Sequence, residues 1–406
     1  MGLRAAIPSR ASAALGVVLH ACEINDYTGS SPTTSPSRFD AIVIGVGGMG
    51  SAPYHLARRG LRVLGLDRFE IPNEQGSSHG ITRAIRLAYA EDPAYVPLLP
   101  RAYEGWRELE TEADKQLLHI TGSMDISRPD QPIVQGAIRS CEEYGLPYEL
   151  LEAAEVARRF PGYRLDPEMV ALLQPDGGFI LPERAIAAHA RGALAAGAEL
   201  RPGERVTGWE PTAEGVRVST AVATYEAERL VITAGAWIGD LTGLPVVAER
   251  QVLAWLEPRR PQLFTPDRFP VFHMQAADGH RYYGLPEFGI PGFKLGRYHH
   301  FRERGPADQL DRTPRADDEQ MLRAFAERYF PEGAGPALSM AGCMFENTPD
   351  GHFIIDRLPG LPQVLVAGGG SGHGFKFCPV IGEILAELAI DGTTRYDIGL
   401  FRIDRF

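Results

Sequence analysis

The sequence predicts an α/β fold in which a Rossmann-type βαβ domain is joined to a second, mostly antiparallel-sheet domain. The run "FDAIVIG" is rich in Val and Ile, fits a strand buried on both faces, and leads into a glycine-rich loop and a helical segment. In two later stretches, "AERLVITAGAW" and "QVLVAGGGSGHGFKF", an apolar run also leads into small residues. The runs "VLAWLEP", "RYYGLP" and "GFKLGRYHH" are typical of strands and predict the sheet of the second domain.

Length and composition limit the possible classes of protein. The chain has 406 residues, which suggests about two domains. Its 44% hydrophobic and 23% charged residues are ordinary for a globular protein. The net charge of −11 argues against nucleic-acid binding, and no apolar run approaches the ~18 residues of a membrane span.

The first 38 residues are rich in Ser, Thr and Pro towards their end, and we predict a disordered extension there. Their opening has the outline of a signal peptide, but Gly16 and His20 interrupt its apolar core. A non-native extension from an early start codon is the alternative. The four cysteines are scattered, without C-x-x-C or metal-site spacing, so we expect a reducing, cytoplasmic location and no metal.

The glycine-rich loop has the form G-x-G-x-x-G at Gly45, Gly47 and Gly50, and the following strand ends at Asp67. In such a unit the first glycine allows a tight turn, the second lets a pyrophosphate approach the backbone, and the third allows close helix packing. The helix N-terminus attracts phosphate, and the acidic residue is placed to bind ribose hydroxyls. The complete strand–loop–helix–strand–acid pattern therefore predicts a dinucleotide site.

The rest of the chain favours FAD over a nicotinamide dinucleotide. After Asp67 the regular βα pattern gives way to the loop "RFEIPNEQGSSHGITRAIRLAY", which contains three arginines. Several buried strands, far apart in sequence, then converge on small residues, as expected for a large flavin cofactor.

Lysine is rare, because only three of the 41 basic residues are lysine. Lys115 belongs to a charged helical segment and is predicted to be solvated. Lys294 and Lys376 lie among apolar or glycine residues, where a compact, tunable amine suggests a function that arginine cannot supply.

Together these residues resemble the monomeric sarcosine oxidase and N-methyltryptophan oxidase family of the D-amino-acid-oxidase superfamily. The resemblance runs from Phe39 to Phe406 and is carried by "VIGVGGMGSA", "GSSHGITRAIRLAY", "GGFILPERAI", "TAGAW", "YYGLPEFGIPGFKLG", "CMFENTPDGHFIID" and "SGHGFKF". It implies a monomeric oxidase of secondary amines, typically N-methyl or cyclic amino acids, with oxygen as acceptor and hydrogen peroxide as product. It also implies covalent FAD, held by a thioether from Cys343.

Further roles follow from the resemblance. Arg86 and Lys376 would bind the substrate carboxylate, Lys294 would activate oxygen over the flavin, and Arg83 and Tyr283 would lie at its reactive face. Cofactor contacts are implied for Gly45, Gly47, Gly48, Met49, Gly50, Asp67, Arg68, Ser78, His79, Thr82, Arg83, Val206, Ala234, Gly235, Cys343, Gly372, Gly374, Phe375 and Lys376.

Two positions depart from the family pattern. Phe345 replaces a tyrosine two residues after the cysteine, and Tyr298 replaces a histidine four residues after the lysine. A one-residue bulge would return His299 to the site as a catalytic residue. Since Phe345 and Tyr298 are expected to line the substrate cavity, the substrate need not be sarcosine.

The FAD domain is expected to comprise residues 39–120, 176–247 and 346–406, and the substrate domain residues 121–175 and 248–345. Three alternatives remain open. A dehydrogenase would pass electrons to a quinone or protein instead of oxygen. An inert flavin-binding scaffold would lack activity. A serine hydrolase would use the G-x-S-x-G match at Gly76, Ser78 and Gly80, although eight residues separate this match from the strand that ends at Asp67.

Overall fold

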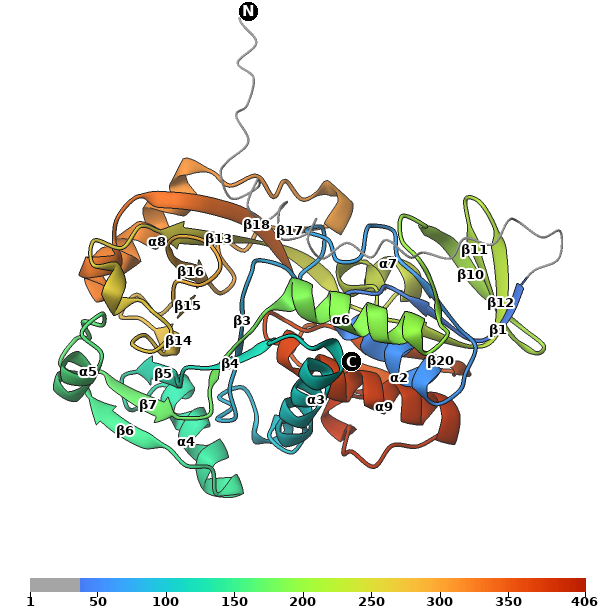
Figure 1. Ribbon diagram of the computed structural model, residues 1–406, viewed down its shortest axis with the longest axis horizontal. Helices are drawn as coiled ribbons and strands as arrows, with labels where there is room; N and C mark the ends of the chain where they lie inside the picture. Colours follow the sequence, from blue (N-terminus) through green and yellow to red (C-terminus); the bar gives the residue numbers. More distant parts are fainter. Residues whose placement is uncertain (1–36) are drawn as a thin grey trace, which may run out of the picture.

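A computed structural model describes residues 37–406 and contains two large sheets that lie side by side along the long axis of the molecule (Figure 1). The extension predicted over residues 1–38 lies outside the described residues, apart from its last two, which begin the first strand. Among the described residues, no helix is long and apolar enough to cross a membrane.

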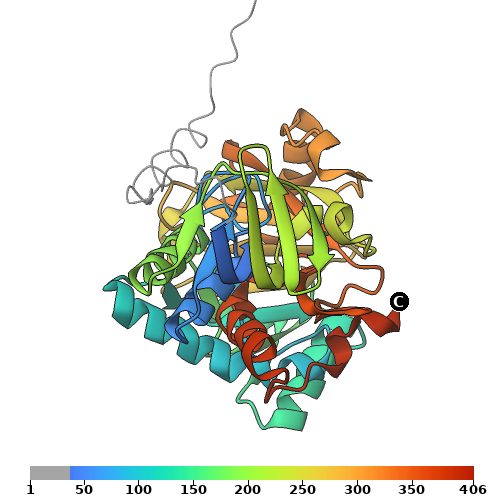
Figure 2. The ribbon, with the colours of Figure 1, turned by 90° about the vertical axis from the view of Figure 1, so that its right-hand side faces the viewer.

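The eight-stranded sheet contains the predicted βαβ unit. Its central strands run parallel in the order β9-β2-β1-β12-β20, and the β10–β11 hairpin pairs with the first half of β12 (Figure 2, where the yellow-green hairpin faces the viewer). The strands are β1 (Ser37–Ile44), β2 (Val63–Leu66), β9 (Glu199–Arg201), β10 (Val206–Thr212), β11 (Gly215–Thr220), β12 (Thr224–Ile232), β19 (Ile354–Leu358) and β20 (Leu361–Gly368). The runs near 232 and 366 form β12 and β20, which are parallel neighbours, and β12 also pairs with β1.

The nine-stranded sheet is mostly antiparallel and contains the three strands predicted for the second domain as the neighbours β13-β16-β15. Its strands are β5 (Ser123–Ser127), β6 (Glu149–Glu152), β7 (Val170–Gln174), β13 (Val247–Leu256), β14 (Val271–Gln275), β15 (Arg281–Leu285), β16 (Phe293–Arg297), β17 (Arg304–Gly305) and β18 (Ala337–Asn347). A small third sheet joins β3 (Arg83–Ile85), β8 (Gly178–Ile180) and β4 (Leu118–Ile120).

The helices cover the sheets through apolar faces. Beside the eight-stranded sheet, α2 and α3 both pack against α6 and α9, and α9 is buried along nearly its whole length. The helices are α2 (Ala52–Arg58), α3 (Leu98–Ala113), α4 (Pro132–Tyr144), α5 (Ala153–Arg159), α6 (Pro182–Ala195), α7 (Ile238–Thr242), α8 (Ala316–Tyr329) and α9 (Cys378–Asp391).

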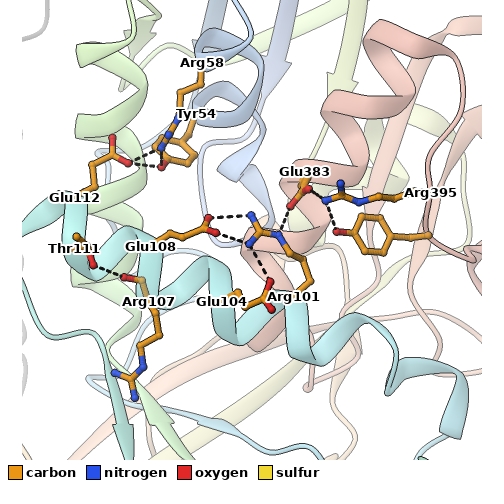
Figure 3. A network of polar contacts seen from close by, with 11 residues as sticks. Tyr54, Arg58, Arg101, Glu104, Arg107, Glu108, Thr111, Glu112, Glu383 and Arg395 are labelled. Carbon is orange, nitrogen blue, oxygen red and sulfur yellow. Dashed lines mark hydrogen bonds and ion pairs between the residues drawn. The ribbon is translucent and has the colours of Figure 1, made fainter.

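A polar network joins α2, α3 and the C-terminal segment at the surface of this layer (Figure 3). Arg101 of α3 donates hydrogen bonds at 2.7 Å to Glu383 of α9 and at 2.6 Å to Glu108, and Arg395 also bonds Glu383. The network therefore fixes the helices that support the glycine-rich loop and the last strand.

Candidate active site

The glycine-rich loop between β1 and α2 has the geometry that its sequence predicts. Gly45 has a φ of +94°, and a Cβ there would lie 2.6 Å from the carbonyl oxygen of Thr233. A Cβ on Gly50 would lie 2.3 Å from the Gly45 carbonyl oxygen, whereas one on Gly47 would meet nothing within 4 Å. Gly45 and Gly50 are thus required by packing, and Gly47 leaves its backbone open to a ligand.

This loop lines a cavity, which we call the glycine-loop cavity. It is bordered by Gly45, Gly47, Gly48, Met49, Asp67, Arg68, Ser78, Val206, Ala234 and Gly235, and also by Phe69, Ser77, Glu204, Trp237 and Glu346. Ten of the predicted cofactor contacts therefore come together here. Gly50 is behind the loop, where it supports the turn.

Asp67 and Arg68 close one end of the glycine-loop cavity. Asp67 accepts hydrogen bonds from the backbone N–H groups of Val46 (2.8 Å) and Phe69 (2.9 Å), and burial raises the pKa of Asp67 to about 6. The guanidinium of Arg68 lies over the rings of Phe69 and Trp237, 4.8 Å from each centroid. These residues form a polar and aromatic end that suits an adenosine.

A second cavity, which we call the lysine cavity, lies between the two large sheets. It is lined by Met49, Ser77, Ser78, Thr82, Arg83, His273, Tyr283, Lys294, Tyr298, Cys343, Phe345, Glu346, Gly372, His373, Gly374, Phe375, Lys376 and Cys378, among others. Met49, Ser77, Ser78 and Glu346 line both cavities, so the two are contiguous.

Cys343, on β18, is buried in the lysine cavity beside a cation. Its sulfur accepts a hydrogen bond from the guanidinium of Arg83 at 3.3 Å, and the same guanidinium donates to the carbonyl oxygen of Ser77. A neighbouring arginine stabilises a thiolate, which is the nucleophilic form of cysteine. The position therefore suits covalent chemistry.

Lys294, on β16, is fully buried and lines the lysine cavity. Its ammonium donates to the carbonyl oxygens of Gly80 (2.8 Å) and Thr82 (2.5 Å) and lies 5.7 Å from the ring centroid of Trp255. Burial lowers the pKa of Lys294 well below its ordinary value, and the positive charge of Arg83 adds to this effect.

Lys376 lies in the lysine cavity, but Arg86 does not. Lys376 donates to the carbonyl oxygen of His373 at 2.6 Å, and burial lowers the pKa of Lys376 to about 7. Arg86 forms an ion pair with Glu91 at 2.7 Å and lies 3.8 Å from Asp125. It lines an adjoining small cavity, the arginine cavity, with Glu91, Asp125, His273, Arg281 and Tyr298. Lys376 and Arg86 therefore line two adjoining cavities, but both cations lie over the ring of Tyr89, 5.2 Å and 4.9 Å from its centroid, and the charge of Arg86 helps to lower the pKa of Lys376.

Three aromatic side chains form one wall of the lysine cavity. The ring of Tyr298 lies 5.3 Å from that of Tyr283 and 5.6 Å from that of Phe345. Burial raises the pKa of Tyr298 to about 12, so this phenol stays neutral. Gly372 is required beside this wall, because a Cβ there would lie 2.5 Å from the Phe345 ring.

The structure places His299 outside the lysine cavity, contrary to the bulge suggested for it. Tyr298 lines the lysine cavity. His299, the next residue, has a left-handed backbone conformation (φ 55°), and its side chain does not line the cavity. Nδ1 of His299 lies 2.8 Å from the buried carboxylate of Glu249, and its side chain is 40% exposed. His79, another predicted contact, is buried but lines neither cavity.

Several site residues were not predicted from the sequence. Trp237, Glu346 and His373 lie within the motifs "TAGAW", "CMFENTPDGHFIID" and "SGHGFKF" and could have been suggested by them, whereas His273 carries no distinctive local signal. Gly76, Ser78 and Gly80 lie in an irregular stretch between β2 and β3, without the strand-to-helix turn that a hydrolase requires.

The two cavities together fit FAD. The open backbone at Gly47 and the uncapped helical turn that begins at Met49 suit a pyrophosphate, and the aromatic end at Trp237 suits an adenosine. The lysine cavity, continuous with the first through Glu346, would then hold the flavin ring beside Cys343 and Lys294.

Comparisons with known proteins agree with this assignment. The chain is 45% identical over 372 residues to monomeric sarcosine oxidase of Streptomyces avermitilis, covering 89% of this chain and 96% of that protein. It is 36% identical over 372 residues to N-methyl-L-tryptophan oxidase of Salmonella dublin, covering 91% and 99%. The family resemblance inferred from the motifs is confirmed.

Solved structures show the same fold. NikD, an unusual amino acid oxidase essential for nikkomycin biosynthesis, is 27% identical with a TM-score of 0.78, covering 90% of this chain and 97% of that one. L-proline dehydrogenase from P. horikoshii shares the fold at 23% identity and a TM-score of 0.79, covering 92% and 98%. Residues 40–388 match the DAO family, described as FAD dependent oxidoreductase. The chain therefore belongs to this family of FAD-dependent oxidoreductases.

Proposed function

We propose that this protein is a flavin-dependent oxidase of secondary amines that carry a carboxylate, most often N-methyl or cyclic amino acids. The main observation in support of this proposal is that Lys376, Lys294 and Cys343 all line one cavity, although they come from three separate segments of the chain. Relatives named as oxidases of sarcosine and N-methyl-L-tryptophan support this substrate class.

When bound, FAD supplies the redox chemistry by accepting a hydride from the carbon beside the amine nitrogen and passing both electrons to oxygen. The balanced reaction converts the secondary amine and O₂ into an imine and hydrogen peroxide. Water then hydrolyses the imine to a primary amine and an aldehyde, or opens a cyclic imine to a carbonyl compound.

Lys376 is the residue proposed to bind the carboxylate. It is buried, lines the lysine cavity and presents an ammonium that forms charge-assisted hydrogen bonds. Arg86 would join it only after its guanidinium leaves Glu91, 2.7 Å away. Substrate binding at both residues therefore includes exchange of one carboxylate partner for another.

Lys294 is proposed to assist oxygen reduction. The carbonyl oxygens of Gly80 and Thr82 hold its ammonium in place. A fixed positive charge in a buried site stabilises an anion that develops beside it, which is the requirement when oxygen accepts its first electron.

Cys343 is proposed to attach the cofactor covalently, with Arg83 stabilising its thiolate. In the balanced reaction, the thiol, the flavin 8α-methyl group and O₂ give a thioether and hydrogen peroxide. A C–S bond replaces one methyl C–H bond, and the two electrons reach oxygen through the flavin. The tether prevents loss of the cofactor.

We further propose a cytoplasmic monomer, in keeping with the sparse cysteines and with the names of the sarcosine oxidase relatives.

The test is anaerobic mixing of the purified protein with a panel of N-methyl and cyclic amino acids, followed by admission of air. Bleaching of the flavin by at least one amino acid, rapid return of the yellow colour and formation of hydrogen peroxide are expected. Bleaching with slow return in air, but fast return with a quinone, would instead identify a dehydrogenase. No bleaching by any carboxylated secondary amine would refute the proposed substrate class.

A further inference from the structure

Glu346 occupies the junction of the two cavities. With Met49, Ser77 and Ser78, it lines both the glycine-loop cavity and the lysine cavity, and its exposed fraction is 8%. A cofactor that extends from Asp67 to Cys343 must pass this carboxyl group. The part of FAD that reaches the junction is its centre, which contains the pyrophosphate and the ribityl hydroxyls.

Among residues 37–406 the carboxyl group of Glu346 has no ion-pair partner, although Arg83, Lys294 and Lys376 line the same lysine cavity. Its carboxyl group accepts a hydrogen bond from the Ser77 hydroxyl and lies against the backbone of Gly370. The titratable groups that face it are Cys343 on its own strand and Cys378 of α9.

A carboxylate in this position would face two phosphate charges at low dielectric, which is strongly unfavourable. We propose that Glu346 contacts the centre of FAD as a neutral carboxylic acid, so that loss of its proton weakens non-covalent FAD binding. A neutral acid can donate a hydrogen bond to a phosphate or ribityl oxygen, whereas a carboxylate cannot. This inference rests on the family's use of FAD and is independent of the amine that the enzyme oxidises.

The direction of the pH effect follows from linkage. Burial raises the pKa of Glu346 to about 7, and the negative charge of bound FAD would raise this pKa further. The dissociation constant should therefore be lowest at acidic pH and should increase as the pH passes about 7. Asp67 and Lys376 also face the cofactor, so the Glu346 contribution must be isolated by substitution.

The experiment uses Cys343→Ser apoprotein, so that FAD binds reversibly, and follows quenching of FAD fluorescence from about pH 6 to about pH 8.5 at constant ionic strength. The dissociation constant should rise about tenfold across this range, which corresponds to one unit of pKa change. Adding Glu346→Gln should remove most of this rise and give tighter binding at the alkaline end. Glu204→Gln, which alters a carboxylate that lines only the glycine-loop cavity, should leave the rise intact.

An equal pH dependence with and without Glu346→Gln, or none in the parent protein, would overturn the proposal. Thermal unfolding of each apoprotein checks that the variants fold. If Glu346→Gln does not fold, Glu346→Asp keeps the acid, and the rise should then move to lower pH. If FAD proves not to be tethered, the same titration is performed on the chain with Cys343 intact, so the two proposals fail separately.

Discussion

The guanidinium of Arg83 lies 3.3 Å from the sulfur of Cys343, although the two residues are on strands of different sheets, β3 and β18. The contact places a permanent positive charge beside Cys343, which is the cysteine of β18. The thiol of Cys378 lines the same cavity without such a partner, and burial raises its pKa well above the ordinary value. The two cysteines of the cavity thus have different electrostatic surroundings.

We therefore expect flavin attachment to depend on Cys343 alone. Acid precipitation of the wild-type protein should give a yellow pellet, and Cys343→Ser should release the colour into the supernatant. Cys378→Ser is the matched control, since it removes a second thiol from the same cavity, and its pellet should stay yellow. A colourless wild-type pellet would show that the cofactor is not covalently bound.

Lys376 should make substrate binding pH-dependent. Its pKa, about 7 in the free protein, rises when a carboxylate binds, so the charged form is available below neutrality and is lost as the pH increases. Inhibition by acetate, a carboxylate that cannot be oxidised, should weaken between about pH 7 and about pH 9. Lys376→Met should weaken inhibition about 10- to 150-fold at low pH, the worth of a charge-assisted hydrogen bond, and abolish the pH dependence. An unchanged pH profile in this variant would exclude Lys376 from carboxylate binding.

The Arg86–Glu91 ion pair provides a test of whether Arg86 binds substrate. Burial disfavours the charged form of Glu91, yet the Arg86 guanidinium holds the pKa of that carboxyl below its ordinary value. If Arg86 must leave Glu91 to bind the substrate, Glu91→Gln should lower the substrate dissociation constant, because the competing partner is weakened. If Arg86 has only a structural role, Glu91→Gln should reduce the melting temperature and leave substrate affinity unchanged or poorer.

Lys294 should separate the two half-reactions. Lys294→Met removes the charge while retaining an apolar stem, and we expect reoxidation by air to slow much more than anaerobic reduction, since the charge is worth up to several kcal/mol to a developing anion. Because burial lowers the pKa of Lys294, wild-type reoxidation should also decline at a lower pH than an ordinary lysine would impose. Stopped-flow absorbance measures both steps. Equal losses in the two steps would indicate a different role.

The parts of the fold that could be predicted are those with a strong local pattern. The glycine motif, the strand ending at Asp67 and the apolar runs near 232 and 366 each carry their signal within a few residues, and the sheet follows once they pair. The two buried lysines could be identified because lysine is so rare in this chain.

Partners that come from distant segments could not be predicted. The sequence does not indicate that Asp125 and His273, from two separate strands, lie beside Arg86 in the arginine cavity. Likewise, the choice between Tyr298 and His299 depends on a left-handed residue and on Glu249, which lies 50 positions earlier in the chain. Such outcomes are decided by tertiary packing, which outweighs local sequence preference.

The lysine cavity also constrains when the cofactor can be loaded. The glycine-rich loop at 45–50 is made early, but Gly372, Gly374 and Lys376 belong to the last tenth of the chain. Domains of a nascent chain fold as their residues emerge, yet this cavity cannot exist before translation has passed position 376. A cofactor that fills the whole site can therefore be held completely only after nearly all of the described residues have been synthesised.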